Sequence, residues 1–175
     1  IASIAPAGSI IKGRRTEELS CDGKIITPGL VSAHSHLSGI SQRGLWDETS
    51  FESWSAKTFA LDSLANFSSE EIYLLHCAAC IEFIRHGVTT VLDMFSAYPS
   101  GALDKVEAAC KALLDTGMRG IMAYSFRDQS PDNKGVTLTS TNAEDIIVTA
   151  LTCAERVTSL SSRLAFMLAP SAPQR

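Results

Sequence analysis

The sequence predicts an α/β fold, namely a partial (β/α)8 TIM barrel that contains about the first four βα units. Strand-like and helical segments alternate from residue 28 onward, and the strand-like segments are almost entirely apolar. Such strands are buried on both faces, as in a parallel sheet covered by helices. The turn after the first strand lacks the G-x-G-x-x-G pattern of a dinucleotide-binding sheet, which favours the barrel. A complete barrel takes about 250 residues, so this chain would supply about half.

The first 27 residues differ from the rest of the chain. They contain short β-like pieces separated by turn signals, of which Asp22-Gly23 is the clearest. This stretch is too short to form a domain by itself, and the sequence starts with Ile1 rather than methionine. We therefore expect it to be the tail of a β-structure that begins before Ile1.

The alternating part of the chain can be divided into four strands and four helices. The expected strands are 29–34, 88–94, 118–126 and 163–170. The expected helices are 50–67, 68–87, 102–117 and 142–160. The second of these helices has the strongest signals, because Ser68 and Glu71 have the spacing of a capping box and Gly87 stands at the C′ position. The polar stretch 127–140 is expected to be a loop.

Composition and charge exclude several classes of protein. The net charge of −4 offers no basic field for a nucleic acid. No apolar run approaches the roughly 18 residues of a membrane span, and the amino terminus lacks the basic residues of a signal peptide. Five cysteines, an odd number, suit reduced thiols in a cytoplasmic protein. Cys77 and Cys80 are i, i+3 neighbours on the second helix, where we expect small buried residues.

Two histidines stand one residue apart where the first strand ends, in the stretch PGLVSAHSHL. Alternate side chains of a strand point to the same side, so His34 and His36 are expected to face the mouth of the barrel together. Two imidazoles in this arrangement can chelate a divalent metal ion, zinc or iron. The alternative is that they are incidental polar residues of a strand.

Three stretches resemble one protein family. DGKIITPGLVSAHSHL is similar to the start of the barrel in the amidohydrolase superfamily, and QRGLWDETSFESW and RHGVTTVLDM resemble its next landmarks. The branch they resemble contains triazine chlorohydrolases, cytosine and guanine deaminases and adenosine-type deaminases. The resemblance covers only the N-terminal part of that family. It implies that residues 1–27 are the remnant of a small β-sandwich, that 28–175 form the N-terminal half of a metal-dependent hydrolase barrel, and that His34 and His36 are metal ligands.

The resemblance also implies a reaction. Members of the family deaminate or dechlorinate a nitrogen heterocycle with a metal-activated water, and the branch is typically dimeric. The other metal ligands and the proton-transfer groups follow later strands, so we expect no catalytic residue here and no activity from these 175 residues alone. His76 and His86 share one helix and are expected to be structural. The alternatives are a non-catalytic amidohydrolase-like scaffold and a half-barrel that dimerises to close.

Several further residues are candidates for the site. Trp54 matches a tryptophan that lines the substrate pocket in similar deaminases, and the alternative is a core residue. Asp93 is expected to close the second strand and face the mouth, where it either supports a ligand histidine or caps a turn. Arg127 and Asp128 follow the third strand and are candidates for substrate contact. Ser171 stands where adenosine-type deaminases carry a substrate-contacting histidine, which leaves other ring substrates open.

Overall fold

The computed structural model describes residues 3–6, 8–9, 13, 17–54, 57, 67–96, 103–126, 129–131, 138–140 and 142–170. Its strands are β1 (Leu30–Ser35), β2 (Val88–Ser96), β3 (Arg119–Phe126), β4 (Gln129–Pro131), β5 (Leu138–Ser140) and β6 (Leu164–Pro170). Its helices are the 3-10 helix η1 (Leu37–Gln42) and the α-helices α2 (Ser69–Arg85), α3 (Leu103–Asp115) and α4 (Ala143–Leu160). No helix in these ranges is long and apolar enough to cross a membrane.

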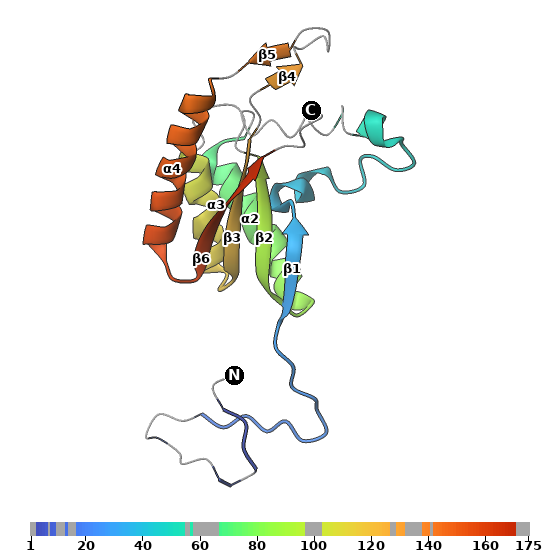
Figure 1. Cartoon of the computed structure of the whole chain (residues 1–175). Helices are drawn as coiled ribbons and strands as arrows, with labels where there is room; N and C mark the ends of the chain where they lie inside the picture. The colour runs from blue at the N-terminus through green and yellow to red at the C-terminus, as the bar shows by residue number, and fades with distance from the viewer. Residues whose placement is uncertain are drawn as a thin grey trace.

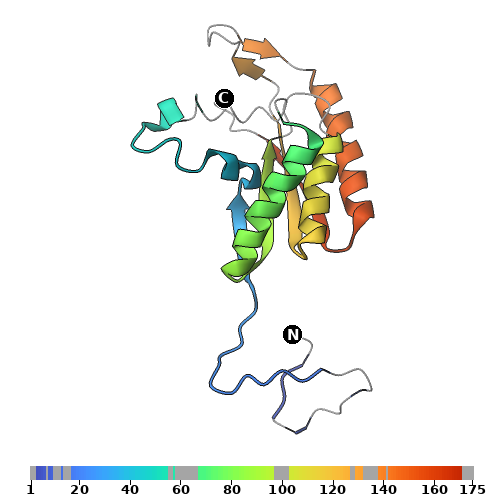
Figure 2. The same cartoon turned by 180° about the vertical axis from the view of Figure 1, so that it is seen from behind.

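The main sheet has four parallel strands in the order β1-β2-β3-β6. Helices α2, α3 and α4 cover one face of it, in front of which they stand in Figure 2, whereas the sheet stands in front of them in Figure 1. Each helix connects one strand to its parallel neighbour, as βαβ units require. The structure confirms the predicted partial barrel.

The core lies between the sheet and the helices. On β2, Val91, Asp93 and Phe95 are buried at alternate positions and face α2 and α3, while the residues between them are half-buried. The apolar members pack against Cys80 on α2 and Leu113 on α3, among other side chains. An apolar face at period 2 in the strands therefore meets apolar faces of the helices, which is what holds the layers together.

The ends of α2 are formed as the sequence predicts. The Ser68 side chain accepts a hydrogen bond from the Glu71 amide at 3.2 Å, and a Glu71 carboxylate oxygen accepts from the Ser68 amide at 2.7 Å. These reciprocal bonds satisfy two amides that the first turn would leave unpaired. Gly87 follows the helix with φ +82°, a left-handed conformation that glycine adopts at little cost.

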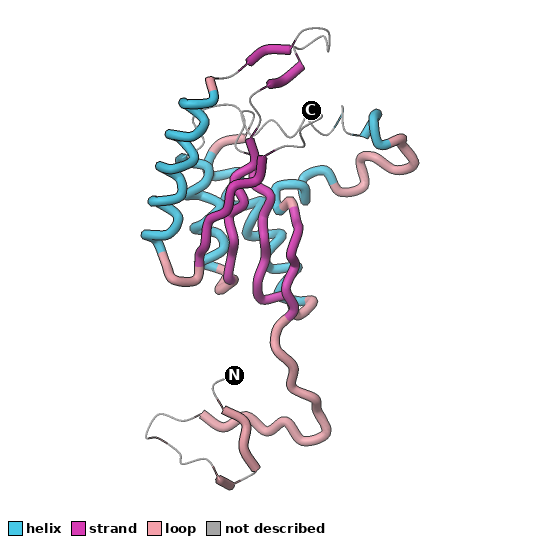
Figure 3. Tube along the Cα trace, in the orientation of Figure 1, coloured by secondary structure: helices cyan, strands magenta, loops and turns pink. Residues whose placement is uncertain are grey.

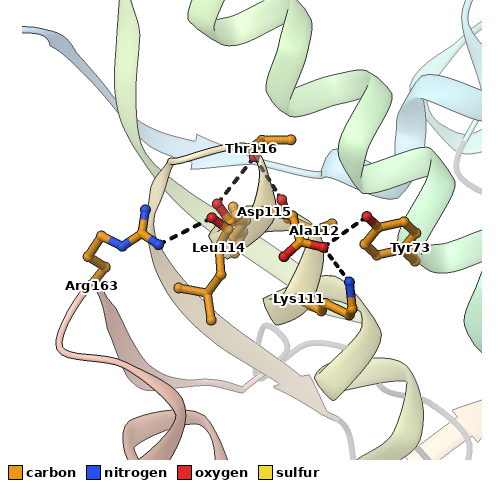
Figure 4. Close-up of polar contacts among 8 residues, drawn as sticks. Tyr73, Lys111, Ala112, Leu114, Asp115, Thr116 and Arg163 are labelled. Atoms are coloured by element: carbon orange, nitrogen blue, oxygen red, sulfur yellow. Dashed lines mark hydrogen bonds and ion pairs between the residues drawn. The ribbon is translucent and has the colours of Figure 1, made fainter.

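Polar contacts at the end of α3 connect three elements (Figure 4). Tyr73 on α2 donates a hydrogen bond to the Asp115 carboxylate at 2.9 Å. The Arg163 guanidinium, in the turn before β6, donates to the Leu114 carbonyl oxygen at 3.2 Å, and the Thr116 hydroxyl donates to two other carbonyls of the last turn. Three of the four carbonyls that the helix leaves unpaired at its C-terminal end, those of residues 112–114, are thereby satisfied.

Three segments differ from the expectations or extend them. The stretch 127–140, predicted to be a loop, instead contains two short strands, β4 and β5, which pair in antiparallel orientation. Of the expected helix 50–67, residues 51–54 and 57 are helical. Described residues before Pro28 contain turns but no strand (Figure 3), so the β-sandwich remnant stays a prediction. Arg127, Asp128 and Ser171 lie outside the described residues.

Candidate metal-binding site

His34 and His36 lie side by side at the carboxyl end of β1, which is an edge strand of the sheet in Figure 1. Their ring centroids are 5.2 Å apart, with the ring planes at 76°, and both side chains are exposed. Ser35, between them, is aligned with Asp93 of β2 and donates a hydrogen bond to the Leu92 carbonyl oxygen at 2.8 Å. His34 is thus the residue of β1 before Ser35 and His36 directly follows the strand, so both imidazoles stand at the carboxyl end of β1.

The donor set of this pair suits a divalent metal of the zinc type. Two imidazole rings on one stiff strand supply the nitrogen ligands that zinc prefers. Within the ranges that the structure describes, no group of three or more His, Cys, Asp or Glu residues could hold a metal ion. That His34 and His36 are two ligands of a larger metal site stays a prediction.

A buried polar network lies directly behind this pair. Asp93, only 1% exposed, accepts a hydrogen bond from the Leu37 amide at 2.9 Å through Oδ1. Its Oδ2 is 3.0 Å from Nε2 of His76, which is fully buried. Nδ1 of His76 lies 2.7 Å from the Ile72 carbonyl oxygen, to which it donates.

The position of Asp93 corrects one expectation. The sequence predicts that Asp93 closes the second strand and faces the mouth, but β2 continues to Ser96 and Asp93 faces the helices. The reason is strand alternation, which groups Asp93 with Val91 and Phe95 on the covered face. His76 packs outside the sheet as expected, but it is paired with Asp93. The sequence does carry a signal for this pair, because His76 and Asp93 are polar residues in largely apolar segments, and buried polar groups require partners.

The turn after the two histidines is held against α2. Arg43, one residue past η1, forms an ion pair with Glu82 of α2 at 2.8 Å, and its hydrogen bond, together with its positive charge, lowers the pKa of Glu82. A cleft of about 570 Å³ lies between the turn and the helix. Its lining is mainly apolar and includes His36, Leu37, Ile40, Ala79, Phe83 and Val88.

Trp54, the predicted substrate-binding residue, lies in the helical turn 51–54. Its side chain is 41% exposed, and its ring lies 5.9 Å from that of Phe51, centroid to centroid. In Figure 1 this turn stands near the end of the molecule toward which the parallel strands point, the end that carries the active site in barrel enzymes. The indole is therefore exposed among the described residues, and its contact with a substrate stays a prediction.

The cysteines near the site are inert by virtue of burial. Burial raises the pKa of the Cys80 thiol to about 11, and it raises that of Cys110 to about 12, with the charge of Asp93 adding to both shifts. Both are fully buried, as expected for Cys80, whereas Cys77, also expected to be buried, is half-buried. A neutral thiol is a poor nucleophile and a poor metal ligand, so these side chains act as small apolar residues.

Curated relatives of this chain are deaminases. The chain is 32% identical over 133 residues to a 5'-deoxyadenosine deaminase of Methanobrevibacter smithii, an alignment that covers 75% of this chain and 28% of the relative. It is 26% identical over 172 residues to a 5-methylthioadenosine/S-adenosylhomocysteine deaminase of Pyrococcus furiosus, covering 97% of this chain and 37% of the relative. The chain spans about a third of the length of the curated relatives it matches.

Solved structures show the same fold at low sequence identity. The atrazine chlorohydrolase of Arthrobacter aurescens, crystallised with zinc and atraton, superposes with a TM-score of 0.67 at 20% identity, covering 82% of this chain and 34% of the other. An adenosine deaminase of Xanthomonas campestris with bound zinc has a TM-score of 0.63 at 18% identity, covering 82% and 29%. The model of the amidohydrolase family matches residues 25–170, nearly the whole of the sheet and its helices. The chain therefore belongs to the amidohydrolase family.

Proposed function

We propose that this chain is the metal-binding, N-terminal half of the barrel of a longer enzyme that hydrolytically deaminates, or dechlorinates, a nitrogen heterocycle. The observation that carries the proposal is the pair of exposed imidazoles, His34 and His36, side by side at the carboxyl end of β1. Active sites of barrel enzymes lie at this end of the strands. Deaminases among the relatives and a chlorohydrolase among the similar structures support the reaction class.

The residues of this chain have defined roles in the proposal. His34 and His36 hold the divalent ion, for which zinc suits imidazole ligands and two of the similar structures contain zinc. When bound, such an ion lowers the pKa of a water ligand and makes it a nucleophile near neutral pH. The exposed indole of Trp54 contacts the flat heterocycle by stacking. The remaining ligands and the group that moves protons come from chain beyond these residues.

The setting of the enzyme is part of the same proposal. The five cysteines all lie among the described residues and form no disulfide with one another, which suits a cytoplasmic protein with reduced thiols. The exposed apolar residues of β1 and α4, such as Val31 and Leu151, suit contacts with the rest of a barrel or with a second subunit of a homodimer. The substrate is a small molecule, and the net charge of −4 disfavours nucleic acid.

Zinc titration and a substrate panel test the proposal in the full-length protein. The panel contains 5'-deoxyadenosine, 5-methylthioadenosine and atrazine, with ammonia or chloride release as the readout. We expect turnover of at least one compound, and the variants His34→Ala and His36→Ala to lose both zinc and turnover. Loss of a ligand should exceed the roughly 10- to 100-fold drop in metal affinity that follows loss of an outer hydrogen-bond partner.

The matched control is His86→Ala, which removes an exposed imidazole at the C-terminal end of α2. This variant should keep zinc and activity. Zinc binding that is unchanged in the His34→Ala, His36→Ala double variant would refute the proposed ligands. A full-length protein that binds zinc through these residues but hydrolyses no compound of a broad heterocycle panel would favour the scaffold alternative. For the 175-residue chain with added zinc we expect no turnover.

A further inference from the structure

We propose that Asp93 and His76 form a positioning pair that holds His36 in the orientation required for metal binding. The inference rests on the proposed function, in which His36 is a metal ligand. It assigns a role to two residues that do not themselves face the metal site. Both are buried under the helices, whereas the two imidazoles at the end of β1 are exposed. They act on His36 through the backbone that follows it.

Each polar side-chain atom of His76 and Asp93 has a hydrogen-bond partner. Nδ1 of His76 donates to the Ile72 carbonyl oxygen at 2.7 Å, since a carbonyl can only accept. A proton therefore lies between Nε2 of His76 and Oδ2 of Asp93, which are 3.0 Å apart. The other carboxylate oxygen, Oδ1, accepts from the Leu37 amide at 2.9 Å. A chain of three hydrogen bonds thus runs from the backbone of α2 to the residue next to His36.

Burial makes this network stiff. His76 is 0% exposed, and Asp93 and Leu37 are each 1% exposed, so water does not compete for the bonds. In a buried medium of low dielectric, breaking one hydrogen bond of the network leaves an unpaired polar group, which costs free energy. The fully bonded arrangement is therefore favoured over the others. The Phe95 ring, 5.9 Å from the His76 ring between centroids, packs beside it. The carboxylate therefore holds the Leu37 amide at a defined place.

His36 is bracketed by two anchors. On one side the Ser35 hydroxyl donates to the Leu92 carbonyl oxygen at 2.8 Å, and on the other the Leu37 amide is bound by Asp93. Its own carbonyl accepts from the Gly39 amide at 3.0 Å as the chain enters η1. Anchors on the residues before and after His36 hold its backbone and so set the direction of its Cα–Cβ bond. Histidine ligands need such orientation, because their ring nitrogens have to meet the ion at a defined angle.

The first test compares Asp93→Ala with Asp93→Asn in the full-length protein, by zinc affinity in competition with a chromophoric chelator. The alanine variant removes the acceptor of the Leu37 amide, and we expect zinc affinity to fall by about 10- to 100-fold. The asparagine variant keeps both bonds, because its oxygen accepts from Leu37 and its amide donates to a His76 ring protonated on Nδ1. We expect its affinity to stay within threefold of wild type.

The second test uses His76 and preserves most of the core volume. In His76→Gln the side-chain amide reaches the place of Nε2 and keeps a donor on Asp93. In His76→Asn the shorter amide reaches only the place of Nδ1, so the carboxylate loses that donor. We expect wild-type zinc affinity for the glutamine variant and an affinity about tenfold lower for the asparagine variant.

The control is Leu113→Ala, which removes a fully buried side chain on α3 with no bond to this network. It should lower the melting temperature but leave zinc affinity unchanged, which separates positioning from general loss of stability. The proposal is overturned if Asp93→Ala and His76→Asn both bind zinc within threefold of wild type while His36→Ala does not. Failure of the proposed function looks different: zinc binding would then be absent, or insensitive to His34→Ala and His36→Ala, and the positioning role would fall with it.

Discussion

Gly29→Ala tests how closely β1 has to approach β2. A Cβ atom at residue 29 would lie 2.8 Å from Cβ of Thr89, and closer still to its Oγ1 and Cγ2 atoms. Rotation of the Thr89 side chain moves the outer two atoms but not Cβ, which is fixed to the β2 backbone. Ordinary contacts begin near 3.4 Å, so the strands would have to part by several tenths of an ångström. That movement strains the hydrogen bond from the Leu30 amide to the Gly87 carbonyl oxygen, now 2.8 Å long.

The expected cost is that of overpacking, about 1–3 kcal/mol of unfolding free energy. For a chain of this size each kcal/mol lowers the melting temperature by about 2–4 °C. Urea unfolding followed by circular dichroism measures the change. Gly39→Ala is the matched control, because its Cβ would meet only Cβ of His36 at 3.8 Å, and it should stay within about 0.5 kcal/mol of wild type.

A double-mutant cycle identifies the cause. In a Thr89→Gly background the obstructing Cβ atom is absent, so Gly29→Ala should cost clearly less there than in wild type. The reasoning is refuted if Gly29→Ala costs less than about 0.5 kcal/mol, or if the cost is the same in both backgrounds.

Four other predictions follow from the same structure. At pH 8 iodoacetamide should modify half-buried Cys21 well before Cys80 or Cys110, as mass spectrometry can follow, and equal rates would contradict their burial. Burial raises the pKa of the Cys80 thiol from 9.0 to about 11 and that of Cys110 to about 12. The contribution of these neutral thiols to the free energy of unfolding should therefore be complete below pH 9.0, and it should be lost as the pH rises through about 11 and about 12. Ser68→Ala should cost about 1 kcal/mol in urea unfolding, because the capping box loses its side-chain acceptor, and an unchanged midpoint would argue against that bond. Under the proposed function, Trp54→Ala in the full-length protein should raise KM for the heterocycle more than it lowers kcat, and an unchanged KM would indicate a structural role for Trp54.

The architecture is largely predictable from sequence because its signals are local. Apolar strands, amphipathic helices, the Ser68 capping box and Gly87 each depend on residues within a few positions of one another. Parallel strands joined by helices then follow from the short connections. The hairpin of β4 and β5 escaped prediction, because its three-residue strands carry too little pattern to distinguish them from a polar loop.

The candidate site divides in the same way. The H-x-H spacing and the strand end are local, and they are sufficient to place His34 and His36 side by side on one face. The sequence places Asp93 at the end of the second strand, whereas β2 runs past it to Ser96, because sequence patterns locate element ends only within a few residues. Alternation groups Asp93 with Val91 and Phe95, and the docking of the helices decides that this face is the buried one.

The sequence by itself determined which elements form, the order in which they alternate and which two imidazoles stand at the end of the first strand. Only the tertiary structure decided that His76 on α2 meets Asp93 on β2, 17 residues away, and that the carboxylate also binds the Leu37 amide, 56 residues away. The physical reason is that periodicity specifies which face of an element is buried, whereas the partner of a buried polar group is set by how helix and sheet dock.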